Sequence, residues 1–335
     1  MKLSDFDYKL PKELIAQKPV RPRDHSRLMV LFKKNKTIKH DYFYNLGQYL
    51  KETDILVIND SKVIPAKIVG KKETGGKTEI LLLKQIKDNL WEALVKKGKE
   101  NKIVKIAPGF ELKILERVEN GIWRIKFNLS NKKLEQALNS FGKAPVPPYI
   151  KRVSNLKEYQ TVYAKVKGSV AAPTAGFHFT KNLINKLKKQ NIKFESITLH
   201  VGLGTFLPVR EENIKKHKMH PEWVEIKKET SKKLNQAKKN NQRIIAVGTT
   251  TVRALESFCV NKELSFGSKE VSLFIYPGYK FKFIDGMITN FHLPKSTLLM
   301  LVCAFASRDF IFKAYKEAIK KKYRFYSFGD AMLII

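Results

Sequence analysis

Cysteines and long apolar runs are scarce in this chain. Its 335 residues include only two cysteines, Cys259 and Cys303, which are too few for a disulfide framework and favour a reduced compartment. The longest apolar run, 298–306, is much shorter than the ~20 residues that cross a bilayer. The first residues carry charge and lack the apolar core of a signal peptide. We therefore expect a cytoplasmic protein that is neither exported nor embedded in a membrane.

Acidic residues are also few. The chain has 31 of them against 65 lysines and arginines, which gives a formal net charge of +34. A surplus of this size attracts polyanions and releases their counterions on contact, so it favours a nucleic-acid partner. Only 11 of the basic residues are arginines, and many lysines stand in runs such as 320–322, which are typical of solvated helix faces. An ordinary lysine-rich surface therefore remains an alternative.

A stretch from about residue 67 to residue 128 has the pattern of strands alone. In 122–127 apolar and basic residues alternate. The pair Asn120-Gly121, directly before this stretch, favours a two-residue hairpin turn. The residues 74–77, Thr-Gly-Gly-Lys, indicate a second tight turn. A helix is expected next, capped by Ser130 or Asn131 and stopped by Gly142, and the proline-rich 144–149 is typical of a stiff linker. With 43% hydrophobic residues the chain can bury a core for this module and for a larger domain.

On either side of this module, strands alternate with helices. Strands are expected at 55–60, 196–201, 243–247, 271–276 and 287–291, and helices beginning at Thr180, Thr230 and Asp309. This alternation is typical of α/β folds with mostly parallel strands. The sequence therefore predicts a discontinuous α/β domain, residues 1–66 and 149–335, interrupted by a small antiparallel β domain at 67–148.

Four of the expected strands are followed by polar or glycine-rich loops. Asp60 follows the first strand, His200 and Gly202 follow another, the run Gly-Thr-Thr-Thr-Val-Arg occupies 248–253, and His292 lies in the loop 289–297. Ligands of α/β sheets and barrels gather at the carboxyl ends of strands. The threonines after Gly248 suit a carboxylate or phosphate at a helix start, although an ordinary capped helix would look similar.

Several common cofactor and metal motifs are incomplete. Gly202 and Gly204 lack the third glycine of a dinucleotide fingerprint, since position 207 is leucine, and there is no Walker A motif. His217 and His220 have no cysteine or third histidine nearby in sequence, so a solvated pair is favoured over a metal site. Single histidines are usually structural, but His178, His200 and His292 all lie in or beside loops rich in glycine or proline.

Five stretches carry a close resemblance to a known family. They are VAAPTAGFHFT (170–180), HVGLGTFLPV (200–209), GTTTVRALES (248–257), TNFHLPKSTLLMLVCAFA (289–306) and YRFYSFGDAMLI (323–334). Together they resemble the S-adenosylmethionine:tRNA ribosyltransferase-isomerases of queuosine biosynthesis, and the likeness covers almost the whole chain. The resemblance implies a bacterial cytosolic enzyme with a distorted α/β barrel-like main domain and an inserted small antiparallel β-barrel.

The resemblance also implies a reaction and its partners. S-adenosylmethionine would give its ribosyl part to the aminomethyl group of a deazaguanine at the tRNA wobble position, and isomerisation would yield epoxyqueuosine while adenine and methionine leave. S-adenosylmethionine is then a co-substrate, and no metal or further cofactor is implied. The partner would be a tRNA anticodon stem-loop bound to a monomer, without an obligatory protein partner or membrane.

Such chemistry needs a base for the ribose carbon beside the sulfonium and an acid for the departing adenine. The candidates are His178, His200, His292 and Asp60, and the sequence does not assign them to one role or the other. Arg253 and the threonines are expected to hold the methionine carboxylate, and the small residues before His178 to lie against a flat ring. The expected substrate-binding residues are Ala172, Thr174, Gly176, Gly202, Thr249, Thr250, Arg253, Asn290, Lys62 and Lys67.

Lys62 and Lys67 stand where the related sequences have arginines, in NDSKVIPAK rather than NDTRVIPAR. A lysine offers phosphate a point charge instead of a bidentate fork, which affects the expected RNA contact. Two alternatives to this enzyme stay open. A non-catalytic RNA-binding protein of the same fold would leave the donor intact, and a methyltransferase would produce S-adenosylhomocysteine.

Overall fold

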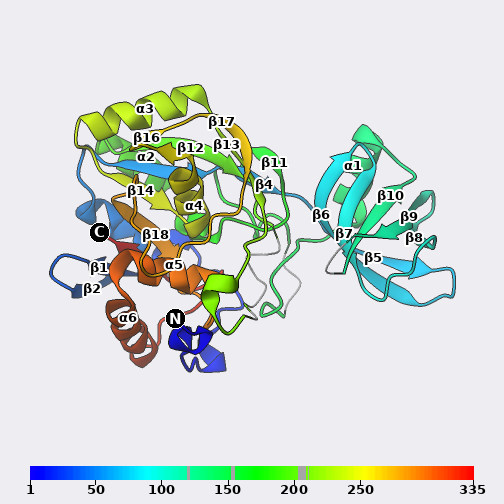
Figure 1. Cartoon of the computed structure of the whole chain (residues 1–335), viewed down its shortest axis with the longest axis horizontal. Coiled ribbons are helices and arrows are strands. Elements are labelled where there is room, and N and C mark those ends of the chain that lie inside the picture. Colours follow the sequence, from blue (N-terminus) through cyan, green and yellow to red (C-terminus); the bar gives the residue numbers. More distant parts are fainter. Residues whose placement is uncertain (119–120, 152–154, 203–208, 210) are drawn as a thin grey trace. The chain divides into compact units, whose positions relative to one another are not determined.

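The computed structural model describes residues 1–118, 121–151, 155–202, 209 and 211–335 (Figure 1). Asn120 of the expected hairpin and Gly204 lie outside these ranges. The chain forms two compact units. The larger comprises 1–61, 161–166 and 173–335, and the smaller comprises 62–160 and 167–172.

The smaller unit contains a closed barrel of six strands in the order β10-β7-β6-β5-β8-β9. All its strand pairs are antiparallel. Alternate residues face the interior of the barrel, as in β7, where Trp91, Ala93 and Val95 are buried. The strands are β5 (Lys67–Lys72), β6 (Lys77–Lys87), β7 (Leu90–Val95), β8 (Ile103–Ala107), β9 (Phe110–Arg117) and β10 (Ile122–Phe127).

The predicted helix with its caps and the predicted turn at 74–77 are confirmed in this unit. Helix α1 (Asn131–Phe141) has Ser130 as its N-cap residue and Gly142 as its C-cap residue, and it buries Leu134 and Leu138. A tight turn with Gly75 at φ 81° joins β5 to β6. The chain passes between the two units along β4 (Ser61–Val63) and β11 (Val166–Ser169), which pair with each other.

The larger unit is built on a nine-stranded mixed sheet in the order β17-β13-β12-β3-β14-β18-β19-β1-β2. At its centre β12, β3, β14 and β18 run parallel as neighbours. The strands are β1 (Arg27–Phe32), β2 (Thr37–Tyr42), β3 (Ile55–Asn59), β12 (Lys193–Leu199), β13 (Glu222–Ile226), β14 (Ile244–Val247), β17 (Gly267–Val271), β18 (Gly286–Asn290) and β19 (Ala331–Ile334). The expected α/β fold with an inserted antiparallel barrel is therefore confirmed.

Two details of the sheet differ from expectation. Antiparallel neighbours are as frequent as parallel ones, because β13, β17, β19 and β2 each run against a neighbour. The strand expected at 271–276 is instead β17, which ends at Val271. The apolar residues after Val271 pack into the interior without forming strand hydrogen bonds. Ile275 is buried, and the carbonyl of Leu273 accepts a hydrogen bond from the Arg253 side chain.

Within the described residues five α-helices accompany this sheet: α2 (Lys181–Lys189), α3 (Lys228–Lys239), α4 (Thr249–Phe258), α5 (Thr297–Ala306) and α6 (Arg308–Lys320). Thr180 caps α2 as expected, its Oγ1 accepting from the Leu183 backbone N–H at 3.1 Å. α3 begins two residues before Thr230 and α6 one residue before Asp309. α5 is buried along most of its length, which explains its apolar sequence. In the described ranges no helix combines the length and apolar character needed to span a membrane.

Short elements complete the larger unit. They are the 3-10 helices η1 (Leu3–Phe6), η2 (Lys12–Leu14), η3 (Arg23–His25), η4 (Phe43–Tyr49), η5 (Thr174–His178) and η7 (Ile214–Lys216), and the strand pair β15 (Cys259–Val260) and β16 (Glu263–Leu264). η5 ends at His178, the first of the candidate histidines, and η3 lies against η5.

Candidate functional site

The four parallel strands of the larger unit end at one edge of the sheet. Asn59 of β3 pairs in register with Ile197 of β12, and Val247 of β14 pairs with Ile288 of β18. The residues that follow these strands, including Asp60, His200, Thr249 and His292, therefore gather at the carboxyl edge.

The ends of β3 and β12 are tied together by Asn59. Its side-chain amide donates to the Leu199 carbonyl at 2.9 Å, and its Oδ1 accepts from the Leu199 N–H at 3.0 Å. The next residue, Asp60, is buried and accepts from Thr198 Oγ1 at 2.7 Å. Asn59 is a positioning residue that sequence reasoning missed, although its place directly before Asp60 at the end of the strand was a signal.

His200 stacks on Trp223, with ring centroids 5.0 Å apart and a 20° interplanar angle, and lies within electrostatic range of Asp60. Its Nδ1 is buried and has no hydrogen-bond partner among the residues described. Burial lowers the pKa of His200 below its usual value, and the Asp60 carboxylate acts in the opposite direction. The imidazole is thus neutral at neutral pH, with a carboxylate nearby that would stabilise its protonated form.

His178 is fixed at both ring nitrogens. Ser26 Oγ lies 2.7 Å from Nδ1, and the Asn290 amide lies 3.1 Å from Nε2 and also donates to the Tyr326 carbonyl. Burial, and then Arg23 and Arg324, lower the pKa of His178 to about 3. The ring is therefore neutral, and because Nε2 accepts from the amide, Nδ1 carries the proton that is donated to Ser26.

A cavity of about 10 Å³ borders His178, which is room for about one water molecule. It is lined by Pro19, Val20, Arg23, Ser26, Phe177, His178, Ser327, Phe328 and Gly329. Asn290, which bonds His178, also accepts a hydrogen bond from Thr174, whose hydroxyl donates to its Oδ1 at 3.3 Å. The structure therefore brings three of the expected site residues together. Ser26 was missed, since nothing in its local sequence indicates a histidine 152 residues away.

The contacts of His292 are more typical of a structural role than those of the other two histidines. Its backbone N–H donates to the Tyr315 hydroxyl at 2.9 Å, and its carbonyl accepts from the Tyr8 hydroxyl. Its ring Nε2 lies 2.8 Å from Thr289 Oγ1, and burial lowers its pKa to about 3. These contacts order the turn after β18.

The small residues before His178 are close-packed. A Cβ atom on Gly176 would lie 2.0 Å from the Tyr163 hydroxyl oxygen and 2.7 Å from Thr161 Cγ2. Ala175 is buried and faces Gly248, which has φ 95° at the start of α4. Packing of the protein itself therefore accounts for the glycine at 176.

The first turn of α4 contains three buried threonines. Thr251 Oγ1 donates to the Val247 carbonyl at 2.8 Å, whereas Thr250 Oγ1 is buried with no hydrogen-bond partner in the described ranges. The N–H groups of a first helical turn have no partners within the helix and carry partial positive charge. Together they suit an anionic group.

Arg253, one turn further along α4, is paired with Glu222. Its Nη1 lies 2.5 Å from Glu222 Oε2, its Nε donates to the Leu273 carbonyl at 3.0 Å, and both side chains of the ion pair are 3% exposed. Glu222 Oε1 accepts from the Gly202 N–H at 2.9 Å. Within the described part of the chain Arg253 Nη2 has no partner. One nitrogen, rather than a bidentate fork, is thus available to a ligand, and Glu222 is a third residue that sequence reasoning missed.

Three expected residues lie in the smaller unit. Ala172 is buried there. Lys67 forms an ion pair with Glu79 at 3.2 Å, its side chain being 40% exposed, and Lys62 is half-buried. Glu135 is paired with Lys167 and lies within electrostatic range of Lys62.

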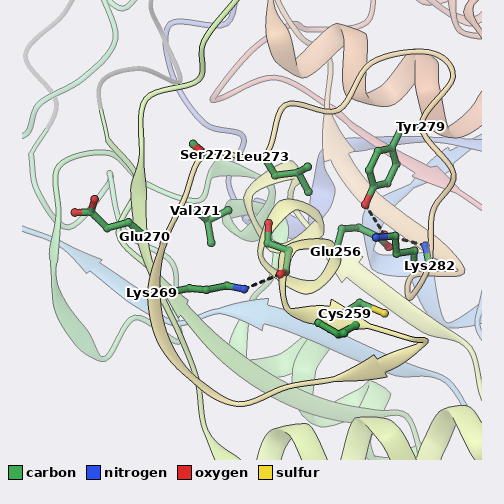
Figure 2. A pocket seen from close by; sticks show the side chains of 11 residues that line it. Glu256, Cys259, Lys269, Glu270, Val271, Ser272, Leu273, Tyr279 and Lys282 are labelled. Carbon is green, nitrogen blue, oxygen red and sulfur yellow. Dashed lines mark hydrogen bonds between the residues drawn. The ribbon is translucent and has the colours of Figure 1, made fainter.

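A larger cavity, of about 460 Å³, lies around the carboxyl-terminal end of α4 (Figure 2). Its most buried acid, Glu256, already accepts hydrogen bonds from the Tyr279 hydroxyl and the Lys282 N–H. None of the site residues expected from sequence line it. The lining residues are Glu256, Ser257, Cys259, Val260, Lys269, Glu270, Val271, Ser272, Leu273, Tyr279 and Lys282.

Metal ligands do not cluster at either cavity. Among the described residues there is no group of three or more histidine, cysteine, aspartate or glutamate side chains that could hold a metal ion.

Comparisons with known proteins agree over the full length. The sequence model of a family described as "Queuosine biosynthesis protein" matches residues 3–334. Proteins named S-adenosylmethionine:tRNA ribosyltransferase-isomerase align with 100% of this chain and 100% of their own length. The one from Thermotoga petrophila is 51% identical, that from Thermosipho melanesiensis 54% and that from Aquifex aeolicus 49%. A crystal structure of S-adenosylmethionine tRNA ribosyltransferase from Thermotoga maritima matches with a TM-score of 0.59 and 40% identity, over 99% of this chain and 100% of that one.

Proposed function

Since the chain belongs to the S-adenosylmethionine:tRNA ribosyltransferase-isomerase family of queuosine biosynthesis, we propose that the carboxyl edge of its parallel strands is where the reaction takes place. The enzyme transfers the ribosyl part of S-adenosylmethionine to tRNA and isomerises it to epoxyqueuosine. The acceptor is the aminomethyl group of a deazaguanine at the wobble position, and adenine and methionine leave. The observation that carries the proposal is the convergence of Asp60, His200 and the α4 start at one edge.

The methionine carboxylate binds at the start of α4. The unpaired N–H groups of the first turn, the Thr250 hydroxyl and Arg253 Nη2 supply the donors, and residues 250 and 253 share one helix face. Thr249 belongs to the same turn. Because Glu222 occupies Arg253 Nη1, the arginine is held in one orientation before the ligand arrives.

His200 and Asp60 move the proton. The lowered pKa keeps His200 neutral, so it can accept a proton from the ribose carbon beside the sulfonium. The neighbouring Asp60 carboxylate stabilises the imidazolium that forms. That imidazolium is then the acid available to the departing adenine, because His178 and His292 are neutral at neutral pH.

His178, held by Asn290, which itself accepts from Thr174, lines the site as a hydrogen-bonding group. Gly202 fixes the loop after His200 through Glu222, and Gly176 and Ala172 keep their neighbourhoods compact. Lys62 and Lys67 contact phosphates of the anticodon stem-loop.

The wider organisation is part of the same proposal. Residues 1–66 and 149–335 form the catalytic domain, and 67–148 the inserted domain. The enzyme works in the cytoplasm as a monomer, without an obligatory protein partner.

The assignment of roles is tested by single-turnover kinetics on His200→Asn, Asp60→Asn and His292→Ala, with His220→Asn as the control because His220 is exposed. His200→Asn should slow the chemical step by about 10²- to 10⁴-fold and leave tRNA affinity by filter binding near wild type. His292→Ala should lower the melting temperature. A stable His200→Asn enzyme with a normal single-turnover rate would remove His200 from the mechanism, and His178, His292 and Asp60 would remain.

A further inference from the structure

Three aromatic rings form a column on the surface of the larger unit. Tyr42 and Tyr44 stack with centroids 5.5 Å apart and planes within 4° of parallel, and His25 packs at a tilt against Tyr44, with centroids 5.1 Å apart and a 55° interplanar angle. Tyr42 is 47% exposed, His25 is exposed and Tyr44 half-buried. Stacked rings that stay in contact with water, rather than packing into a core, present an aromatic face to a partner.

The column stands at the same edge of the sheet as the candidate site. Tyr42, the last residue of β2, pairs in register with Arg27 of β1. The adjacent Leu28 pairs with Ala331 of β19, which pairs with Asn290 at the carboxyl end of β18. β2 is the terminal strand on this side of the sheet (Figure 1).

The column is also linked to the site through the chain. His25 directly precedes Ser26, whose hydroxyl lies 2.7 Å from His178 Nδ1. The 3-10 helix η3, which ends at His25, also supplies Arg23 to the small cavity beside His178. One short segment therefore extends from the interior of the site to the exposed rings.

The positive charge of the chain as a whole, formally +34, favours a polyanion. Near the rings, Arg23 and Arg27 lie over Phe177 and Tyr323. The nearby carboxylates of Asp24 and Asp41 accept hydrogen bonds from neutral side chains of the protein. Aromatic rings for bases together with cations for phosphates are the combination with which proteins bind unpaired RNA.

We propose that the His25, Tyr44 and Tyr42 column stacks with an unpaired nucleotide of the anticodon loop next to the one that is modified. This inference rests on tRNA being the substrate. A base that enters an active site leaves its stack and exposes the face of its neighbour. Tyr42 at the end of the column replaces that lost stacking, and because every base has a π-face, the contact adds affinity without selecting a sequence.

The test is equilibrium binding of an anticodon stem-loop by Tyr42→Ala, compared with Tyr42→Phe. The alanine variant should bind about 5- to 150-fold more weakly, the range for loss of one stacked base, and the phenylalanine variant should bind like wild type. Phe266→Ala is the matched control. Phe266 is 57% exposed and directly precedes β17, the terminal strand at the other end of the sheet (Figure 1).

Further measurements separate the outcomes. Turnover at saturating tRNA and the KM for S-adenosylmethionine should not change in Tyr42→Ala, and a duplex without a loop should bind wild type and variant equally. Unchanged stem-loop affinity in Tyr42→Ala would overturn the proposal. A change in sedimentation with unchanged RNA affinity would overturn it too and identify the column as a contact between copies of the chain. Wild-type donor consumption, measured alongside, shows whether a failure concerns the column or the enzymatic function.

Discussion

Replacing Gly176 with alanine tests why the segment before His178 is built from small residues. The new Cβ would lie 2.0 Å from the Tyr163 hydroxyl oxygen, 2.7 Å from Thr161 Cγ2 and 2.9 Å from Tyr163 Cζ. Favourable contacts between heavy atoms lie at about 3.5–4.0 Å, so the backbone or the tyrosine must move by more than an ångström. Overpacking of this kind costs about 1–3 kcal/mol, and a melting temperature lower by roughly 2–12 °C follows.

A double-mutant cycle with Tyr163→Phe makes the reasoning specific. Removing the hydroxyl eliminates the 2.0 Å contact but leaves the 2.7 Å contact with Thr161 and the 2.9 Å contact with the ring carbon Cζ, so the double variant should regain part of the lost stability. We expect a coupling of about 0.5–3 kcal/mol by thermal or urea unfolding. An unchanged melting temperature for Gly176→Ala, together with a raised KM for S-adenosylmethionine, would refute the packing account and show that the glycine makes room for the donor.

Three further predictions concern charge. Glu222→Gln leaves the buried Arg253 guanidinium unpaired and should lower the free energy of unfolding by about 3–5 kcal/mol in urea titrations, while adding Arg253→Met should restore part of it; equal stability of Glu222→Gln and wild type would contradict this. His178 and His292, with folded pKa values of about 3, bind fewer protons folded than unfolded below the unfolded value of about 6.5. The contribution of these two histidines to the free energy of unfolding is complete above about pH 6.5 and is lost as the pH falls toward 3. The free energy of unfolding should therefore drop on acidification by up to about 1.4 kcal/mol per pH unit for each histidine, and its slope against pH should be shallower in His178→Asn. Lys62→Gln with Lys67→Gln should raise the KM for tRNA and reduce its salt dependence, with little change in turnover at saturating tRNA; an unaltered salt dependence would exclude both lysines from the RNA contact.

Local patterns made much of the fold predictable. The strand pattern of β10, the glycine turn at 75 and the caps of α1 and α2 depend on residues a few positions apart, and the structure has them where expected. The strand at 271–276 was wrong because its apolar residues are buried by tertiary packing and not by a ladder. Apolar composition alone does not separate these two environments.

The site was less predictable because its partners are distant in sequence. The strand ends could be found from their loops, but the bonds from Asn59 to Leu199 and from Ser26 to His178 span 140 and 152 residues. The ion pair of Arg253 spans 31 residues and changes how that arginine meets a ligand. The protonation states of the histidines follow from burial, which a sequence does not display.

The fate of the donor tests the central claim most directly. The enzyme is incubated with S-adenosylmethionine labelled in its ribosyl carbons and tRNA that carries the aminomethyl-deazaguanine base, and the products are separated by chromatography. We predict that adenine and methionine appear in equal amounts and that the label is found in the tRNA. Formation of S-adenosylhomocysteine, or tRNA binding with the donor left intact, would contradict the account.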